Sequence, residues 1–227
     1  MDENYVKCHS SSRAYTKYDR WHNRKMTQST RDRMILGTAD LLRRRGVSAT
    51  SIREVVRYSG TPRGSVAHHF PGGKRQLLEA AVEHAGREVS VPLAELLAQH
   101  GPVPGLEHFV ARWRQMLEET RYQAGCAVLA VAVEQYVSDQ RGEANPDLDS
   151  QVQEQLLDHA HAIFRDWQRI IAEALLRTGA SEARAASMAL MVIAAIEGSV
   201  ALCRAARSAE PLDAIWQELR QSLGAIA

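Results

Sequence analysis

The hydrophobic positions of this chain repeat with the period of an α-helix, and no stretch alternates as a β-strand does. Ile35, Ala39 and Leu42 share one helical face, for example, and glycine or proline stands at most breaks between such segments. The pattern predicts an all-α fold of about nine helices. We expect them at residues 29–45, 51–60, 62–68, 74–100, 106–120, 125–137, 146–176, 181–207 and from 211 onward, with Pro92 kinking or splitting the fourth.

Two short helices joined by a tight turn follow the first predicted helix. Ser51 and Glu54 form a capping box, in which the hydroxyl accepts from an early backbone N–H and the carboxylate reaches back to the N–H of Ser51. Gly60 ends this helix and Pro62 begins the next. Val66 points inward, which leaves a polar, small outer face made of Thr61, Arg63, Ser65, Ala67 and His68. Such a face favours a helix-turn-helix that enters the DNA major groove over a surface hairpin without a ligand.

Charge is distributed unevenly along the chain. The formal net charge is only +1, but residues 1–75 hold 16 Lys and Arg against 6 Asp and Glu. Residues 76–227 hold 12 basic and 21 acidic residues. A basic module beside an acidic one fits contact of the first with phosphate, although uneven surface charge alone gives the same counts. Together with the helix pair, the asymmetry makes nucleic acid the favoured partner.

These patterns divide the chain into three parts. We expect a flexible N-terminal arm at 1–27, a helix-turn-helix DNA-binding domain at 28–75, and a helical effector-binding and dimerisation domain at 76–227. The arm has no helical period. It is either an extension upstream of a start at Met26 or a basic arm that reaches the minor groove.

Other classes of protein have little support in the sequence. Three widely spaced cysteines suggest neither a disulfide framework nor a zinc site, and no apolar run approaches the length of a membrane span. There is no signal-peptide pattern, so we expect a cytoplasmic protein without a membrane partner. No catalytic set is evident, and His159 and His161 lie two residues apart on different helical faces. We therefore expect no enzyme, no cofactor and no metal.

The chain resembles the TetR family of transcriptional regulators. The match is carried by Ala39-Asp40-Leu41-Leu42, Gly46, Ser51 to Val55, Gly60 to Val66, His68 to Pro71, and Lys74. Its second half resembles the drug-responsive LmrA/YxaF-like branch, through Gly72-Gly73, Gly125-Cys126, Trp167, Glu197-Gly198-Ser199 and Glu210-Pro211-Leu212.

The resemblance implies roles for individual residues at DNA. Thr61, Pro62, Arg63, Ser65 and His68 would sit on the recognition helix, with Ser51 and Lys74 near phosphates. Arg63 suits bidentate contact with guanine or, as an alternative, contact with phosphate. Family members usually have a tyrosine or another large residue at the position of Ala67. The operator sequence cannot be borrowed from a relative for that reason, although Ala67 can touch a thymine methyl.

The resemblance also implies a homodimer formed through the last two helices, with Ala185, Ala189, Ala194 and Ala195 allowing close approach and Leu212, Trp216 and Leu219 giving an apolar stripe. The alternative places both helices in the monomer core.

A small hydrophobic or aromatic effector would bind between the helices. Its candidate lining is Phe109, Trp113, Met116, Cys126, Phe164, Trp167, Met188 and Met191, each of which also suits an ordinary core. Cys126 is either an oxidant sensor or a buried structural thiol. Glu134 and Glu197 stand in apolar stretches, and each either meets a cationic ligand or is salt-bridged or exposed.

The leading hypothesis is a dimeric repressor of double-stranded operator DNA that ligand binding releases. A DNA-binding regulator without a small-molecule effector, controlled by a protein partner or acting as an activator, is the first alternative. A helical small-molecule-binding protein or enzyme is the second.

Overall fold

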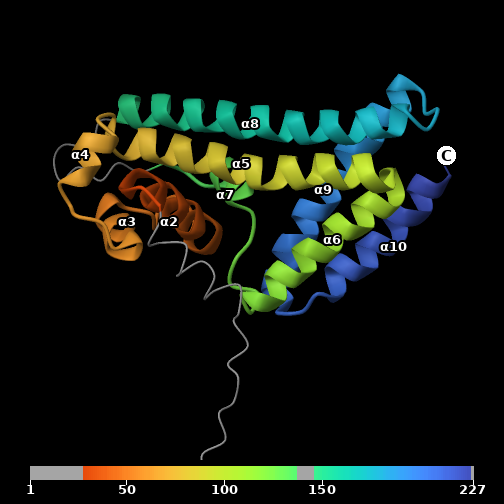
Figure 1. Ribbon diagram of the computed structural model, residues 1–227, viewed down its shortest axis with the longest axis horizontal. Helices are drawn as coiled ribbons and strands as arrows, with labels where there is room; N and C mark the ends of the chain where they lie inside the picture. The colour runs from red at the N-terminus through yellow and green to blue at the C-terminus, as the bar shows by residue number, and fades with distance from the viewer. Residues whose placement is uncertain (1–27, 137–145, 226–227) are drawn as a thin grey trace, which may run out of the picture.

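The computed structural model describes residues 28–136 and 146–225. In these ranges the chain forms helices and no strand, which confirms the all-α prediction (Figure 1). The expected arm at 1–27 lies outside the described residues. The helices are α2 (Thr30–Arg45), α3 (Ile52–Ser59), α4 (Ser65–His69), α5 (Gly73–His100), α6 (Pro102–Glu119), α7 (Ala127–Val133), α8 (Pro146–Leu176), α9 (Glu182–Ala206) and α10 (Glu210–Gly224).

Prolines account for three differences from the expected boundaries. The expected break around Gly101 is a single residue, because Pro102 opens α6, where a missing N–H costs nothing. Pro92 lies inside α5 without splitting it. Pro62 stands outside α4, since its carbonyl accepts from Ser65 N at 3.1 Å in a tight turn and regular helix begins only at Ser65. The predicted helix at 62–68 is therefore too long at its start.

The predicted cap of α3 forms only in part. The Ser51 hydroxyl accepts from the backbone N–H of Glu54 at 3.2 Å, as the capping box requires. The Glu54 carboxylate, however, accepts from Arg45 at 2.7 Å and from Arg57 rather than from Ser51 N–H. Two guanidinium partners outweigh one backbone amide for this half-exposed carboxylate, because charge-assisted hydrogen bonds are the stronger kind.

Two groups of buried side chains hold the helices together. The smaller joins α2, α3, α4 and the start of α5, and consists of Met34, Ile35, Leu41, Val55, Val66, Phe70 and Leu77. The larger fills the space between the remaining helices, and it also takes in Ala39 and Leu42 from α2. Helix α2 is thus buried on two faces, and it ties the helix-turn-helix to the rest of the molecule.

The long helices set the shape of the molecule. Helices α5 and α8 run side by side along its length, with α2, α3 and α4 at one end and α6, α9 and α10 at the other (Figure 1). The short helix α4 therefore stands far from α10. Helices α5 and α8 span the distance between the distal helices and the end where α4 lies.

A carboxylate from α7 holds the loop between α2 and α3. Glu134, the C-cap of α7, accepts from the backbone N–H of Val47 at 2.9 Å and from the amide and hydroxyl of Ser48 at 3.4 and 3.3 Å. Gln153 on α8 fixes this residue by donating to its carbonyl at 3.1 Å. We call these contacts of Glu134 with Val47 and Ser48 the Glu134 clasp.

Gly46 is required beside the clasp for two separate reasons. Its φ of +78° disfavours any L side chain, and a Cβ added there would stand 1.8 Å from a Glu134 carboxylate oxygen. Gly101 has nearly the same backbone, with φ 81° and ψ 179° against 78° and −175°. A Cβ at Gly101 meets nothing within 4 Å. An alanine at Gly101 therefore introduces backbone strain alone, whereas an alanine at Gly46 introduces backbone strain and a steric clash with Glu134.

We expect Gly101→Ala to lower the free energy of unfolding by about 1–3 kcal/mol, through backbone strain alone. Gly46→Ala should cost clearly more, because the methyl group also displaces the carboxylate. Chemical denaturation of both variants measures the difference. When Glu134→Ala is also present, Gly46→Ala and Gly101→Ala should lower the free energy of unfolding by the same amount. If Gly46→Ala still costs more, the role of the clasp is contradicted.

Candidate DNA-binding surface and buried effector site

The helix-turn-helix presents a compact outer surface. Val66 and Phe70 are buried in the smaller core and fix α4 against α2 and α3. Pro62, Arg63, Ala67 and His68 are exposed as predicted, and Ser65 and Ser51 are half-buried. Seven of the eight predicted DNA-facing residues therefore lie in or beside the α3–α4 unit, and the eighth, Lys74, opens α5.

Thr61 does not face outward, and that prediction is wrong. Its side chain is 6% exposed, and its Oγ1 shares a 2.8 Å hydrogen bond with Ser59 Oγ. The chain reverses at Gly60, which adopts the left-handed conformation, and this reversal turns the next side chain inward. Thr61 thus stabilises the turn that aims α4.

Lys74, which the resemblance places near a phosphate, is also buried. It is 6% exposed, and its Nζ lies 5.2 Å from the centroid of the Tyr136 ring. Tyr136 follows α7 and is itself fixed by Gln153, which accepts from its backbone N–H at 2.5 Å. Pairing with an aromatic face makes burial of the ammonium tolerable. In this conformation Lys74 is not available to a phosphate.

Most arginines around the helix-turn-helix are engaged within the protein. Arg43 and Arg44 contact Asp40 at 2.6 and 2.9 Å. Burial raises the pKa of the Asp40 carboxyl, but the two guanidinium charges and a hydrogen bond from Tyr58 outweigh it and hold the pKa below its usual range. Asp40 therefore stays ionised and draws the basic end of α2 inward.

Within the α3–α4 unit, two exposed arginines form no ion pair with the described residues. Arg63 precedes α4 and Arg53 lies in the first turn of α3. Sequence reasoning singled out Arg63 and missed Arg53. The position of Arg53 in the sequence was the available signal. A positive side chain in the first turn of a helix is unfavourable to the helix dipole, so it does not stabilise the fold there.

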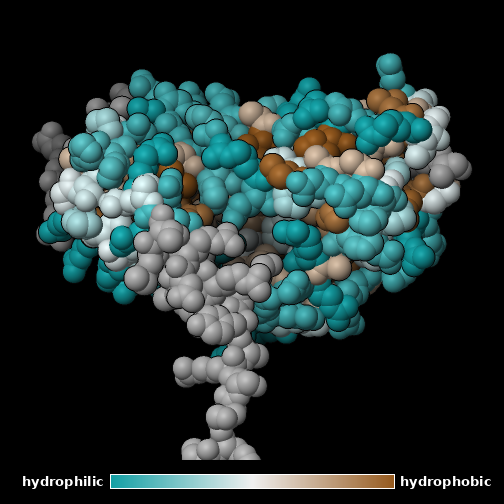
Figure 2. Space-filling model, viewed as in Figure 1, coloured by the Kyte–Doolittle hydropathy of each residue, from teal (hydrophilic) through white to brown (hydrophobic). Residues whose placement is uncertain are grey.

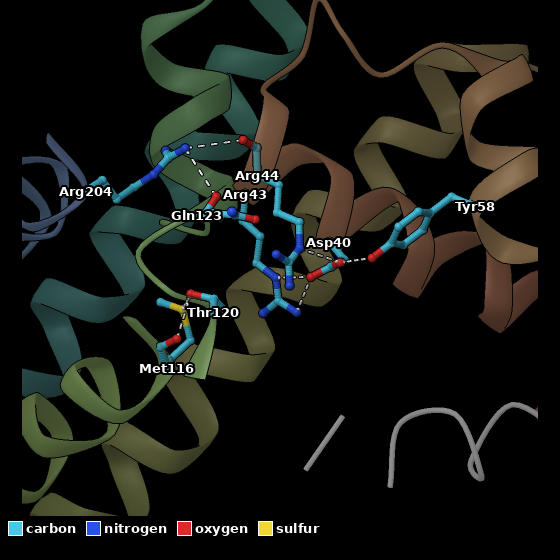
Figure 3. A network of polar contacts seen from close by, with 8 residues as sticks. All are labelled: Asp40, Arg43, Arg44, Tyr58, Met116, Thr120, Gln123 and Arg204. Carbon is cyan, nitrogen blue, oxygen red and sulfur yellow. Dashed lines mark hydrogen bonds and ion pairs between the residues drawn. The ribbon is translucent and has the colours of Figure 1, made fainter. Parts of the chain in front are cut away.

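A polar network joins the end of α2 to the distal helices (Figure 3). Arg204 on α9 donates to the carbonyls of Arg44 and Gln123 at 3.3 and 3.4 Å. Gly125, in the segment before α7, donates its backbone N–H to the carbonyl of Arg43 at 2.8 Å. The last turn of α2 is thereby fixed to α9 and to the α6–α7 connection.

Most of the predicted effector-lining residues meet in the larger core. Phe109, Trp113, Cys126, Trp167 and Met188 are buried there, and Met116 and Phe164 pack against it. Their aromatic rings pair edge to face within each helix, Phe109 with Trp113 and Phe164 with Trp167. These residues form one cluster, as an effector site and an ordinary core both require.

Met191 is not part of this cluster, and its assignment to the effector lining is wrong. It is 40% exposed on the outer side of α9. Helix α9 is apolar on nearly all sides, so its sequence gives no period from which to tell inner from outer positions.

Glu197 on α9 is buried in the larger core without a charged partner among the described residues. It is 6% exposed, and its Oε2 has no hydrogen-bond partner in the described chain. It lies beside the thiol of Cys126, and burial raises its pKa to about 7 against a smaller opposing contribution from that thiol. Burial, followed by the nearby carboxylate, raises the pKa of Cys126 well above its usual value. Cys126 is therefore a protonated structural thiol rather than a reactive thiolate.

A separate cleft opens on the surface between α6 and α10. Its volume is about 460 Å³, and none of the predicted effector residues lines it. Arg114 crosses it to pair with Asp213 at 2.9 Å. Most residues that line this cleft are polar or charged, so it differs from the aromatic and methionine-lined effector site that the sequence predicts.

The outer side of α9 carries a continuous small and apolar surface, which we call the α9 outer stripe. It consists of Ala183, Ala186, Ser187, Leu190, Met191, Ala194, Gly198, Ala201, Leu202 and Ala205, all exposed. Five residues assigned to the dimer face from sequence lie inside the subunit instead, because they pack on neighbouring helices: Ala185, Ala189, Leu212, Trp216 and Leu219.

By length and composition alone, helix α9 is long and apolar enough to cross a membrane. The expectation that no apolar stretch approaches that length is therefore wrong. Half of the most apolar stretch of α9 is buried inside the molecule, however, as in a core helix of a bundle. In the view of Figure 2, the hydrophobic surface lies mainly around α5, α6 and α8, with mostly hydrophilic or neutral surface around α3 and α4.

Comparisons with known proteins agree with this geometry. The profile described as bacterial regulatory proteins of the tetR family matches residues 35–81. The profile of the LmrA/YxaF-like transcriptional regulator C-terminal domain matches residues 148–218.

Similar proteins match over most of their length. An uncharacterized HTH-type transcriptional regulator of Mycobacterium tuberculosis is 35% identical, over 86% of this chain and 95% of the relative. The HTH-type transcriptional regulator LmrA of Bacillus subtilis is 28% identical, over 81% and 90%. The crystal structure of a TetR transcriptional regulator from Chloroflexus aurantiacus superposes with a TM-score of 0.64 at 28% identity, covering 88% and 95% of the two chains.

The buried carboxyl of Glu197 predicts a specific pH dependence of stability. Because its pKa is about 7 in the folded protein and about 4.5 when unfolded, the folded state holds a proton that the unfolded state releases. The free energy of unfolding should fall by about 2–3 kcal/mol between pH 5 and pH 8 relative to Glu197→Gln. Denaturation at fixed protein concentration measures it. Glu154→Gln, at an exposed site on α8, should run parallel to wild type.

Proposed function

The chain belongs to the TetR family of bacterial regulatory proteins, and from this premise we propose that it is a cytoplasmic homodimeric repressor that a small hydrophobic or aromatic ligand releases from its operator. The observation that carries the proposal is the helix-turn-helix, whose exposed α4 surface stands at the end of the molecule far from α10. One such helix reads only a few base pairs, so specific binding needs two copies at half-sites about one helical turn, or a multiple, apart.

At DNA, the exposed residues of the α3–α4 unit divide into two roles. Arg63 would read a base edge or hold a phosphate, and Ala67 would offer a methyl group to thymine. Ser51, Pro62, Ser65 and His68 position the helix through backbone and phosphate contacts. Arg53 joins this set, because its exposed guanidinium has no recorded ion pair in the described chain. Lys74 joins it only if Tyr136 moves away from its ammonium.

For dimerisation, we propose that the α9 outer stripe packs against its copy, with the exposed side of α10 at the rim. A Cβ added to Gly198 would meet nothing within 4 Å, so the stripe leaves room for a partner helix to approach closely. Leu190 and Leu202 are 55% and 57% exposed, and pairing would remove both from water. Burying the exposed half of each side chain is worth about 1 kcal/mol.

For release, the ligand would bind in the larger core and favour a conformation with the wrong spacing between the two α4 helices. This requires that the ligand have different affinities for the two conformations. The contacts of α2 with Arg204 and Gly125, and of the loop after it with Glu134, support the proposal, because they connect the segments around the larger core to the helix-turn-helix.

A titration of duplex DNA from the region upstream of the protein's own gene tests DNA binding. We expect Arg63→Ala to weaken specific binding by tenfold to a few hundredfold, as the loss of a base or phosphate contact does. Arg165→Ala, an exposed arginine on α8, serves as the charge-matched control and should bind as wild type does. Equal loss in both variants would refute the assignment of α4 to the DNA surface.

The dimer is tested by placing a charge in the α9 outer stripe. We expect Leu190→Glu to shift the protein from dimer to monomer in analytical ultracentrifugation at micromolar concentration, because two carboxylates would face each other across the interface. Leu157→Glu on α8 is the matched control, since Leu157 is also exposed, at 38%, but lies outside the stripe. A Leu190→Glu protein that stays dimeric argues for a different interface.

A further inference from the structure

Glu197 is the group in the larger core that the fold itself does not explain. A buried polar atom without a hydrogen bond costs about 1–3 kcal/mol, and each such atom in a native structure calls for a specific cause. Its Oε2 is such an atom, as the described residues supply it no donor. A leucine at this position would satisfy packing alone. The carboxylate therefore indicates a partner that is absent from the isolated chain.

The chemistry around this oxygen is one-sided. Cys126 offers a thiol beside the carboxylate, and Ile193, Ile196 and Val200, on the adjacent turns of α9, are buried in the larger core. Among the described residues, burial and the Cys126 thiol shift the pKa of Glu197, and no lysine, arginine or histidine contributes to the shift. A ligand that fits must be mainly apolar and must bring its own donor to one point.

We propose that Glu197 is the polar anchor of the effector site and accepts a hydrogen bond from the protonated amine of an aromatic or otherwise hydrophobic ligand. This inference rests on the proposed function, because it names the ligand class of that site. A protonated amine supplies both the missing donor and a counter-charge, whereas a hydroxyl supplies the donor only. The carboxyl titrates near neutral pH, so ionising it for an ammonium partner costs little.

The site can enlarge without breaking the fold. Met188 lies in the same core cluster and Met116 packs against it, and methionine side chains repack readily around a ligand. Helix α7 has only seven residues and begins directly after Cys126, its N-cap. Movement of these parts would open space next to Glu197.

Occupation of the site would bear directly on α2. Cys126 is followed by α7 and preceded by Gly125, whose N–H holds the carbonyl of Arg43. Arg204 lies two helical turns beyond Glu197 on α9 and holds the carbonyl of Arg44 (Figure 3). A ligand that displaces Cys126 or shifts α9 therefore strains two hydrogen bonds at the last turn of α2, the helix that positions the helix-turn-helix.

Calorimetric titration with matched amines and alcohols tests the proposal. The probes are 2-phenylethylammonium, 2-(1-naphthyl)ethylammonium and 2-(indol-3-yl)ethylammonium, each paired with the alcohol of the same carbon skeleton. At pH 7.5 we expect at least one ammonium to bind the wild-type dimer tenfold or more tightly than its alcohol. In Glu197→Gln this preference should disappear, while Glu154→Gln on the exposed side of α8 should retain it.

The outcomes separate this inference from the proposed function. Equal binding of amines and alcohols by the wild type, no binding of any probe, or a preference that survives in Glu197→Gln overturns the role of Glu197. The wild-type comparison holds whether or not the variant folds. Operator binding is measured with the same probes. An ammonium that binds through Glu197 and leaves operator affinity unchanged supports the site but contradicts ligand release.

Discussion

The double burial of helix α2 is the constraint on which the arrangement of the molecule depends. One face of α2 packs into the core of the helix-turn-helix through Met34 and Leu41, and another enters the larger core through Ala39 and Leu42. A helix buried on two faces cannot rotate or slide without uncovering apolar surface on one side, at about 25 cal/mol for each Å². Under the proposed release mechanism, a rearrangement of the distal helices would reach α3 and α4 as a displacement of α2.

Polar contacts at the end of α2 add to this connection between the larger core and the helix-turn-helix. The last turn of α2 is held through its carbonyls by Gly125 and Arg204, and the loop that follows it is held through its amides by the Glu134 clasp. Each comes from a segment that borders the core cluster of the proposed effector site. Hydrogen bonds of this kind are worth about 0.5–1.5 kcal/mol each, which is enough to bias a two-state equilibrium and small enough for a ligand to reverse.

The helices and the turn of the helix-turn-helix could be predicted closely from the sequence, whereas the contacts between its edges and distant parts of the chain could not. The periodicity located Val55 and Val66 on the inner faces, and glycine and proline marked the turn at Gly60. The same rules failed for Thr61 and Lys74, because burial at a turn depends on which neighbours the chain folds against. Lys74 is covered by Tyr136, which lies 62 residues later in the sequence and belongs to no helix.

The sequence by itself determined the all-α fold, the helix-turn-helix and the family, because hydrophobic period, capping residues and turn glycines act over a few neighbouring positions. Only the tertiary structure decided the inner and outer sides of α9, since a helix that is apolar all round has no period to read. It placed Met191 on the surface and Glu197 in the core, six residues apart on one helix. It also revealed the Glu134 clasp, which joins residues 86 and 87 positions apart. Contacts of that range depend on packing among all the helices, and no local pattern encodes them.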